Sequence, residues 1–526
     1  MSPDSDHDDD GVPARSQMDL VAAPVRYPTA PLVALVVAAL IPLVGLLVLQ
    51  RWADAEADEF EQTSGVGLFE GELEGSFING DTPPRPAVVG GGASISTQLL
   101  DFRRTPGAMA AIASADQLQG AIEPILGFLS DQSCVAVAVD GLPVISLNPR
   151  LPVIPASNQK LLVALAALDV LGPDHRFTTS VAVPPATEGD VTGDLFLIGG
   201  GDPVLTSDEF PIADDDQPAF STTSLDALAD AVVGAGVTRI RGAVIGDGTR
   251  YDDEFVIDEW ASDVPFVEAG PYDALLVNDA RVLGRSGVED DPAEAAAREF
   301  VRLLGDRGIR VDNGWGSGVA SNLVPVVGTV ESAPLSDIIG EMLVTSDNNT
   351  AEMLVKEIGV AVSGEGSRAA GLAGVQASLQ DLGVSLDGAV LRDGSGLSSG
   401  NRVTCSTVLD VLQIGAAGPL ASSLPVAAET GTLTDEFIAS PVAGRLTAKT
   451  GTLGNPPLGE DPPGVKALAG YVPPLPDTGF GTIQFVVIAN QELITDPTFY
   501  QPLWAAFGER FAGFPAQVDT DSLGPR

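Results

Sequence analysis

Histidine is scarce in this sequence, and its scarcity excludes a common kind of catalytic centre. Of the 526 residues, only two are histidine. His7 lies in an acidic N-terminal tail, so only His175 is available to a folded domain. His175 occupies the turn-like segment Gly172–Arg176, which favours a structural role. A serine–histidine–aspartate triad is therefore hard to build from this chain.

Cysteine is equally rare. Cys134 and Cys405 are too few for a disulfide scaffold and lack the spacing of a zinc site. They could pair outside the cell or remain as two buried thiols. The sequence leaves both readings open, because pairing depends on the distance between their Cα atoms.

Basic residues are few in comparison with acidic ones. The chain has 27 lysines and arginines against 72 aspartates and glutamates, which gives a net charge of −45. Such a chain repels polyanions, so we expect no nucleic-acid partner. Hydrophobic residues make up 44% of the sequence, enough to bury a large core in two or three domains.

A long uncharged run occurs near the N-terminus, from Pro31 to Leu49. It is long enough to cross a hydrocarbon core of about 30 Å, and it exceeds the apolar core of a signal peptide, which is about 7–15 residues. We predict a single-pass membrane anchor over residues 30–50, a cytoplasmic tail over 1–29 and an extracytoplasmic linker over 51–115. The bulk of the chain would then lie outside the cell membrane. A cleaved segment is the alternative.

The rest of the chain alternates helix-like and strand-like patterns in an order that indicates one domain split by another. We predict a mixed α/β (α+β) domain formed by residues 116–172 and 326–512, a β-rich module inserted at 173–325, and a C-terminal tail at 513–526. Within the split domain, the expected strands are 134–139, 142–147, 443–452, 466–472 and 481–490, and the expected helices include 118–129 and 496–512.

Lysine is the rarest of the charged residues. Only four occur, at positions 160, 356, 449 and 466, and arginine supplies every other strongly basic side chain. A buried lysine can lose its proton, whereas arginine effectively cannot. Each lysine therefore suggests a need that is specific to an amine.

The first lysine belongs to the motif Ser157-Asn158-Gln159-Lys160, which opens an apolar helix-like run. A spacing of three residues places Ser157 and Lys160 on one face of a helix. A neutral amine in that position can take the serine proton and produce a nucleophile without histidine. The N-terminus of the helix favours the negative charge that develops.

A second motif, Ser346-Asp347-Asn348, lies between two helix-like stretches. Its serine hydroxyl and carboxamide, two residues apart on a short loop, can point into one cleft, relay a proton and hold a substrate amide. An isolated copy of this tripeptide is more often an ordinary helix cap.

A third motif, Lys449-Thr450-Gly451-Thr452, ends a strand-like run. Lys449 and the two threonine hydroxyls are suited to bind a carboxylate, and we expect Gly451 to leave room for a substrate along the strand. The backbone N–H groups of Thr452 and Ser157 are candidates for an oxyanion hole. A nearby copy, Thr430–Leu433, follows glutamate instead of lysine, and we interpret it as structural.

Together and in this order, the three motifs resemble those of penicillin-binding proteins of the D-Ala-D-Ala carboxypeptidase and endopeptidase type. The resemblance runs from about residue 118 to about residue 512. Segments around and between the motifs strengthen it: Pro155–Leu162, Gly199–Pro203, Ser346–Glu352 and Asp393–Ser398.

The resemblance implies a fold like that of penicillin-binding proteins and β-lactamases, with an antiparallel sheet flanked by helices. It also implies a D-Ala-D-Ala carboxypeptidase, or an endopeptidase, that cleaves peptidoglycan stem peptides through a serine acyl-enzyme and reacts covalently with β-lactams. No metal or organic cofactor is implied. By motif, Ser157 would be the nucleophile, Lys160 its base, Ser346 and Asn348 one wall of the cleft, and Lys449, Thr450, Gly451 and Thr452 the other.

Two alternatives remain. A β-lactamase would share the motifs but needs a device for rapid deacylation, and the inserted module and the predicted anchor argue against it. A non-catalytic envelope scaffold could keep the fold, but it has no evident need for amines at positions 160 and 449. The segment Asn455–Gly464, rich in proline and glycine, could narrow the choice of substrate or form a plain surface loop.

Overall fold

The computed structural model describes residues 106–211, 221–454, 464–474 and 481–514. The predicted anchor over residues 30–50 and most of the segment 455–464 lie outside these ranges. Within them, no helix combines the length and the apolar character that crossing a membrane requires.

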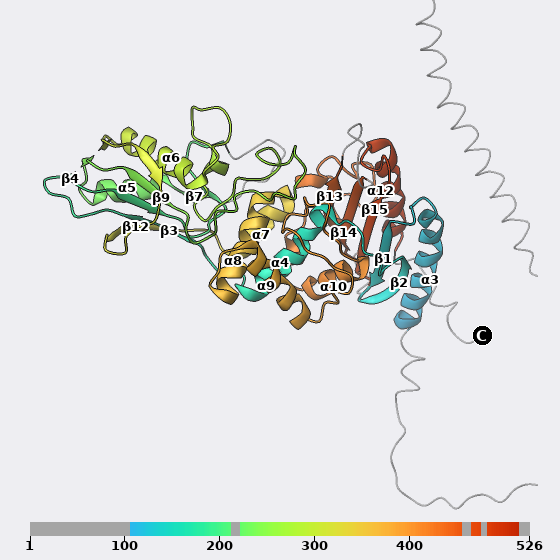
Figure 1. Ribbon diagram of the computed structural model, residues 1–526. Helices are drawn as coiled ribbons and strands as arrows, with labels where there is room; N and C mark the ends of the chain where they lie inside the picture. The colour runs from blue at the N-terminus through green and yellow to red at the C-terminus, as the bar shows by residue number, and fades with distance from the viewer. Residues whose placement is uncertain (1–105, 212–220, 455–463, 475–480, 515–526) are drawn as a thin grey trace, which may run out of the picture. The chain divides into compact units, whose positions relative to one another are not determined.

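The first structural unit is a five-stranded antiparallel sheet in the order β13-β14-β15-β1-β2 (Figure 1). Its adjacent strands β1 and β15 come from opposite ends of the described chain, and β1 pairs with β15 along the whole length of β1. Every residue of these two strands is buried, as expected of strands that are covered on both faces. The strands are β1 Cys134–Val139, β2 Leu142–Leu147, β13 Thr447–Leu453, β14 Val465–Val472 and β15 Ile483–Asn490.

The two faces of this sheet pack into two separate cores, because successive side chains of a strand point to opposite sides. On one face, Val135 and Phe485 pack with helices α3 (Pro106–Leu126) and α12 (Pro497–Ala512). On the other face, Ala136 and Val486 pack with the remaining helices. These are α4 Gln159–Val170, α7 Leu335–Thr345, α8 Asn348–Ser363, α9 Arg368–Asp381, α10 Cys405–Gly415 and α11 Pro419–Ser422.

Helix α3 starts earlier than the sequence suggested. We predicted a linker to residue 115, but the helix begins at Pro106. Proline is well suited to the first helical position, where its missing N–H has no partner to lose. The alanine-rich turns that follow have high helix propensity, although they carry little of the apolar periodicity on which our boundary relied.

Cys134 and Cys405 form a disulfide that joins β1 to the first residue of α10. Both cysteines are fully buried. The bond therefore links the N-terminal and C-terminal parts of the split domain directly across its core.

The inserted module has its own core. A second five-stranded sheet, β11-β9-β5-β3-β12, packs against α5 (Asp226–Gly234) and α6 (Pro292–Asp306) through an apolar cluster distinct from those of the first sheet (Figure 1). Its strands are β3 Thr178–Ala182, β5 Leu195–Ile198, β9 Val244–Asp247, β11 Trp315–Ser317 and β12 Val326–Glu331. Smaller sheets join β4 Asp190–Val191, β8 Arg239–Ile240 and β10 Arg310–Val311, and β6 Leu205–Thr206 with β7 Thr223–Ser224.

The module extends further than predicted. We expected the split domain to resume at residue 326, but Val326–Glu331 form β12, which pairs antiparallel with β3 of the module. The helical pattern returns only with α7, at Leu335. Our boundary was too early because β12 is half exposed and carries no strong apolar signal.

A long segment of the module, residues 248–282, lies against helix α8, and we call it the strap. Its Tyr251, Trp260 and Tyr272 share an apolar cluster with Met353 of α8. Ion pairs reinforce this contact: Lys356 with Asp252, Glu357 with Arg250, and Arg368 at the start of α9 with Glu254. The strap therefore ties the module to the helix that begins at the second motif.

Candidate active site

Ser157 lies in a tight turn at the entrance to helix α4. The turn is a short 3-10 helix, η1 (Ala156–Asn158), that leads directly into α4. Ala156 adopts a left-handed backbone conformation with φ of 48°, which is unfavourable for a residue other than glycine. Ala156 is buried, whereas Ser157 is partly exposed. The strained turn therefore presents Ser157 toward solvent at the positive end of the helix.

Lys160 points into the same region from the first turn of α4. Because α4 is apolar all round, it is buried, and Lys160 is fully buried with it. Its Nζ lies 3.2 Å from Ser157 Oγ, 2.7 Å from Asn348 Oδ1 and 2.8 Å from the carbonyl oxygen of Ser395. Burial lowers the pKa of Lys160 to about 8, against the opposing effect of nearby carboxylates.

The second motif forms the junction between α7 and α8. Ser346 ends α7 in a left-handed conformation, with φ of 65°. Asp347 caps α8 by accepting a hydrogen bond from the backbone N–H of Thr350, so this residue is the helix cap that an isolated copy of the motif would suggest. Its two neighbours are free for another purpose: Asn348 reaches Lys160, and Ser346 reaches Lys449.

Lys449 approaches from the opposite side, on strand β13. It is fully buried, and its Nζ donates to Ser346 Oγ at 2.8 Å and to the carbonyl oxygen of Thr450 at 2.9 Å. Burial, reinforced by the positive charge of Lys160, lowers the pKa of Lys449 well below its usual value. Two of the four lysines of the chain therefore lie close to one serine and one carboxamide of the second motif.

The two threonines of the third motif have different environments. Thr450 Oγ1 donates to Thr432 Oγ1 at 2.8 Å, so the copy of the motif that we interpreted as structural, in η3 (Gly431–Leu433), buttresses the third motif itself. Thr452 is exposed and accepts a hydrogen bond from Lys466 Nζ at 3.0 Å.

Gly451 has a different role from the one we expected. A Cβ atom at Gly451 would lie 3.0 Å from the carbonyl oxygen of Pro155 and 3.2 Å from the backbone nitrogen of Ser157. The space beside the glycine is therefore occupied by the Ser157 turn and not left open for a substrate. Gly451 lets the third motif pack directly against the first.

Several residues at this site were missed as site residues by sequence reasoning. Glu352 is buried beside Lys160, and burial together with Asp393 raises its pKa to about 7. Ser395 contributes a carbonyl oxygen, which no side-chain motif reveals. Glu268, in the strap, accepts a hydrogen bond from Asn348 Nδ2 through its backbone carbonyl. The segments around positions 352 and 393 had drawn notice only as part of the family resemblance.

In the described ranges, no group of three histidine, cysteine, aspartate or glutamate side chains is arranged to hold a metal ion. His175 packs edge to face on Phe177, in the turn after α4.

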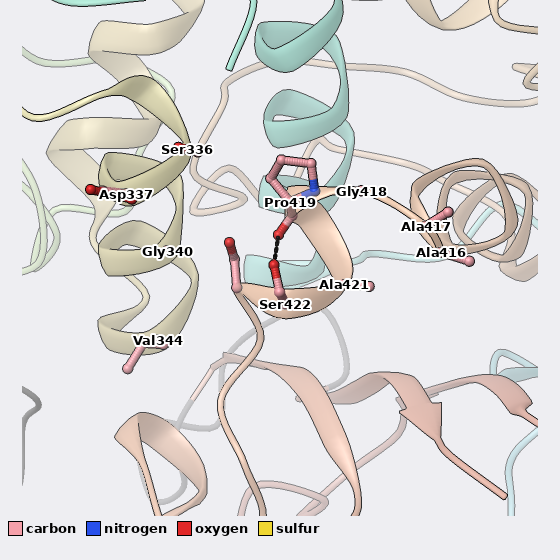
Figure 2. Close-up of a pocket in the computed structure, with 11 residues that line it drawn as sticks. Ser336, Asp337, Gly340, Val344, Ala416, Ala417, Gly418, Pro419, Ala421 and Ser422 are labelled. Atoms are coloured by element: carbon pink, nitrogen blue, oxygen red, sulfur yellow. Dashed lines mark hydrogen bonds between the residues drawn. The ribbon is translucent and has the colours of Figure 1, made fainter. Parts of the chain in front are cut away.

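A cavity of about 790 Å³ lies between α7 and residues 416–423, which include α11 (Figure 2). None of the eight candidate site residues lines it. Its walls are small or polar, with Asp337 as the one charged residue, and Ser422 at its edge donates to the carbonyl oxygen of Pro419 at 3.1 Å. The candidate site therefore lies outside this cavity.

Known proteins resemble this chain in sequence and in fold. The sequence model of the D-Ala-D-Ala carboxypeptidase 3 (S13) family matches residues 130–287 and 284–499. A D-alanyl-D-alanine carboxypeptidase of Actinomadura sp. (strain R39) is 31% identical over 535 residues, covering 82% of this chain and 94% of that protein. A carboxypeptidase of Mycobacterium tuberculosis is 30% identical over 386 residues, covering 70% of this chain and 79% of that protein.

The fold is also found in solved structures. The crystal structure of penicillin binding protein 4 (dacB) from Haemophilus influenzae superimposes with a TM-score of 0.61, at 20% sequence identity, over 74% of this chain and 97% of that one. At this level of identity the comparison establishes the shared architecture.

Proposed function

Because the chain belongs to the D-Ala-D-Ala carboxypeptidase 3 (S13) family and is a serine-type D-Ala-D-Ala carboxypeptidase, we propose that Ser157 is its nucleophile and Lys160 the base that activates it. The observation that carries this assignment is the 3.2 Å approach of Lys160 Nζ to Ser157 Oγ, in surroundings that favour a neutral amine. The substrate is a peptidoglycan stem peptide that ends in D-Ala-D-Ala, and β-lactams are covalent inhibitors.

In the acylation step, the lone pair of neutral Lys160 takes the proton of the Ser157 hydroxyl as the oxygen attacks the carbonyl carbon of the penultimate D-alanine. The carbonyl oxygen becomes negatively charged, and we assign the backbone N–H groups of Ser157 and Thr452 to stabilise it. The C–N bond to the terminal D-alanine then breaks, and the proton held by Lys160 is returned to the departing nitrogen. Hydrolysis of the resulting ester by water regenerates Ser157.

The wall formed by the third motif is suited to the carboxylate of the terminal D-alanine. Lys449 is the buried amine of this wall, and Thr450 and Thr452 add hydroxyl groups. An arriving carboxylate would favour the ammonium form of Lys449, whose pKa burial otherwise lowers. The opposite wall is formed by Ser346 and Asn348 of the second motif. Ser346 is hydrogen-bonded to Lys449, and Asn348 is hydrogen-bonded to Lys160.

Labelling with a fluorescent penicillin tests this assignment. The full chain and its Ser157→Ala variant are incubated with the label, and the adduct is located by intact mass and peptide mapping. We expect one adduct per chain on Ser157 and none in the variant. A folded wild-type chain that takes no label would contradict the acylating site and favour a non-catalytic scaffold.

The lifetime of the adduct separates a carboxypeptidase from a β-lactamase. A peptidase is acylated by penicillin and then releases it slowly, whereas a β-lactamase turns it over. Release of D-alanine from a pentapeptide substrate, together with a persistent penicillin adduct, is the expected result. Cleavage of cross-linked peptide dimers under the same conditions would indicate that endopeptidase action accompanies it.

The membrane location is a separate proposal. It rests on the uncharged run from Pro31 to Leu49 and on the disulfide between Cys134 and Cys405, a bond that is rare in the reducing cytosol. We propose a single N-terminal anchor with the catalytic domain outside the membrane. Fractionation of cells, followed by protease treatment of intact spheroplasts, should degrade the domain from outside. A chain found in the soluble fraction would contradict an uncleaved anchor.

A further inference from the structure

The hydrogen-bond partners of Lys160 determine where its lone pair points. Asn348 Oδ1 and the carbonyl oxygen of Ser395 can only accept hydrogen bonds. The Asn348 amide is oriented by its own nitrogen, which donates to the carbonyl oxygen of Glu268 at 2.7 Å. A neutral amine has two hydrogens, and these two acceptors take both. The lone pair is thereby left facing Ser157 Oγ, the third neighbour of Lys160.

The Ser395 carbonyl is held in place by a loop, Asp393–Ser398, that has its own network of buried hydrogen bonds. The backbone N–H groups of Gly394 and Ser395 donate to the carboxylate of Glu352, at 3.0 Å and 2.7 Å. Glu352 is 1% exposed. The carboxylate therefore fixes the peptide unit that presents its oxygen to Lys160.

The same loop packs directly against the Ser157 turn, η1. Gly396 has φ of 90°, and a Cβ atom there would lie 2.0 Å from the carbonyl oxygen of Ala156. Only glycine allows this approach. The loop thus contacts both the turn that carries Ser157 and the amine of Lys160.

Asp393 anchors the loop to the inserted module. Its carboxylate accepts from the backbone N–H groups of Gly396 and Ser398 and from the Asn401 side chain. It also accepts from the indole Nε1 of Trp260, at 2.9 Å. Trp260 belongs to the strap and is 6% exposed. One side chain of the module is therefore part of the network behind the base.

Taking the proposed function as its basis, we propose that the Asp393–Ser398 loop aims the lone pair of Lys160 at Ser157, with Glu352 and Trp260 as positioning residues that hold the loop for acylation. The inserted module takes part in the reaction through Trp260, although it supplies none of the three motifs.

The charges around the base predict a signature that a purely structural role would not produce. The carboxylate of Glu352 raises the pKa of Lys160, so its removal should lower that pKa and move the acid limb of the rate profile to lower pH. The other charged groups around Lys160 stay in place. These are Asp347 at the start of α8, Asp393 in the loop, and Lys449 on β13.

The experiment measures the rate of acylation by a fluorescent penicillin, from pH 6 to 10, for the full chain. Three variants test the loop: Trp260→Phe removes the indole donor and keeps a ring, Glu352→Gln removes the charge, and Glu352→Asp keeps the charge but shortens its reach. Two controls make the same chemical changes elsewhere. Glu357→Gln alters a buried carboxylate on α8 that pairs with the strap, and Trp315→Phe alters a tryptophan of strand β11.

The amount of label bound at completion gives the number of folded, reactive sites. The rate constant, expressed per folded site, then measures how well Lys160 and Ser157 are oriented, independently of any loss of folded protein. We expect Trp260→Phe and Glu352→Asp to lower the high-pH plateau rate about tenfold, with penicillin affinity unchanged. Glu352→Gln should lower the plateau by a similar factor and also move the acid limb to lower pH. Both controls should keep the wild-type rate and midpoint.

Two results would overturn the inference. One is a wild-type plateau in Trp260→Phe and Glu352→Asp. The other is an equal loss in the two controls, which would reveal a general effect of damage to the inserted module or to α8. A failure of the proposed function is distinct from both, because the wild-type chain would then take no label on Ser157.

Discussion

Acylation should depend steeply on pH, because only the neutral form of Lys160 can accept the serine proton. Burial lowers the pKa of this lysine from 10.5 to about 8, which favours the neutral form. The rate should therefore rise with pH and level off above the pKa. A mechanism that needed the ammonium form would give the opposite slope.

The expected size of the effect follows from that pKa. With a pKa of about 8, roughly a tenth of the lysine is neutral at pH 7 and roughly nine tenths at pH 9, so the rate should increase about tenfold over this interval. An unshifted lysine would be about 300-fold poorer in neutral amine at pH 7, and its rate would still be climbing tenfold per unit at pH 9. The two cases therefore differ in the pH at which the acylation rate levels off.

The assay is the second-order rate constant for labelling by a fluorescent penicillin, measured in buffers of constant ionic strength from pH 6 to 10. Lys160→Arg provides the control, because arginine keeps the charge and cannot act as a base in this range. That variant should lose about 10²–10⁴-fold in rate at every pH. A wild-type profile that is flat between pH 7 and 9, or that falls, would refute the role assigned to Lys160.

Three further changes test features of the fold. Cys405→Ser should lower the free energy of unfolding by about 2–5 kcal/mol in a denaturant titration, and a wild-type chain whose stability is insensitive to reductant would contradict the disulfide. Gly451→Ala should slow acylation more than tenfold, because its Cβ would displace the Ser157 turn, whereas Gly316→Ala, with its nearest neighbour at 3.8 Å, should match the wild type. Lys356→Met should cost about 1–3 kcal/mol of stability, because it removes the donor to the carbonyl oxygens of Asp252 and Glu254 and breaks the ion pair with Asp252. An unchanged unfolding midpoint would show that these contacts contribute nothing.

Sequence spacing predicted correctly which site residues lie together when those residues are close in the chain. Ser157 and Lys160 lie three residues apart on a buried helix, and their side chains meet as that spacing requires. The rarity of lysine was equally informative, since Lys160 and Lys449 are both fully buried. The antiparallel sheet flanked by helices, which the resemblance implied, is the observed architecture.

Long-range packing could not be obtained in the same way. The carbonyl oxygen of Ser395 cannot be recognised from a side-chain motif. Its contact with Lys160 depends on the position of a loop that lies more than two hundred residues away in the sequence. The contact of Trp260 with Asp393 joins two parts of the chain that only the complete fold brings together. Gly451 was misjudged for the same reason: the strand pattern located it correctly, but only the structure shows which neighbour occupies the space beside it.

The pairing of β1 with β15 has a consequence for the order of events during synthesis. β1 is among the first elements of the split domain to be made and β15 is among the last, so the hydrogen bonds between them cannot form until β15 has been made. Contacts between residues so far apart in the sequence form slowly. β13, which packs against the nucleophile turn, also belongs to this late part of the chain. A chain synthesised only as far as α9 would contain Ser157 and Lys160 but lack the wall of the cleft that β13 supplies, so it could not react with its substrate until β13 has been made.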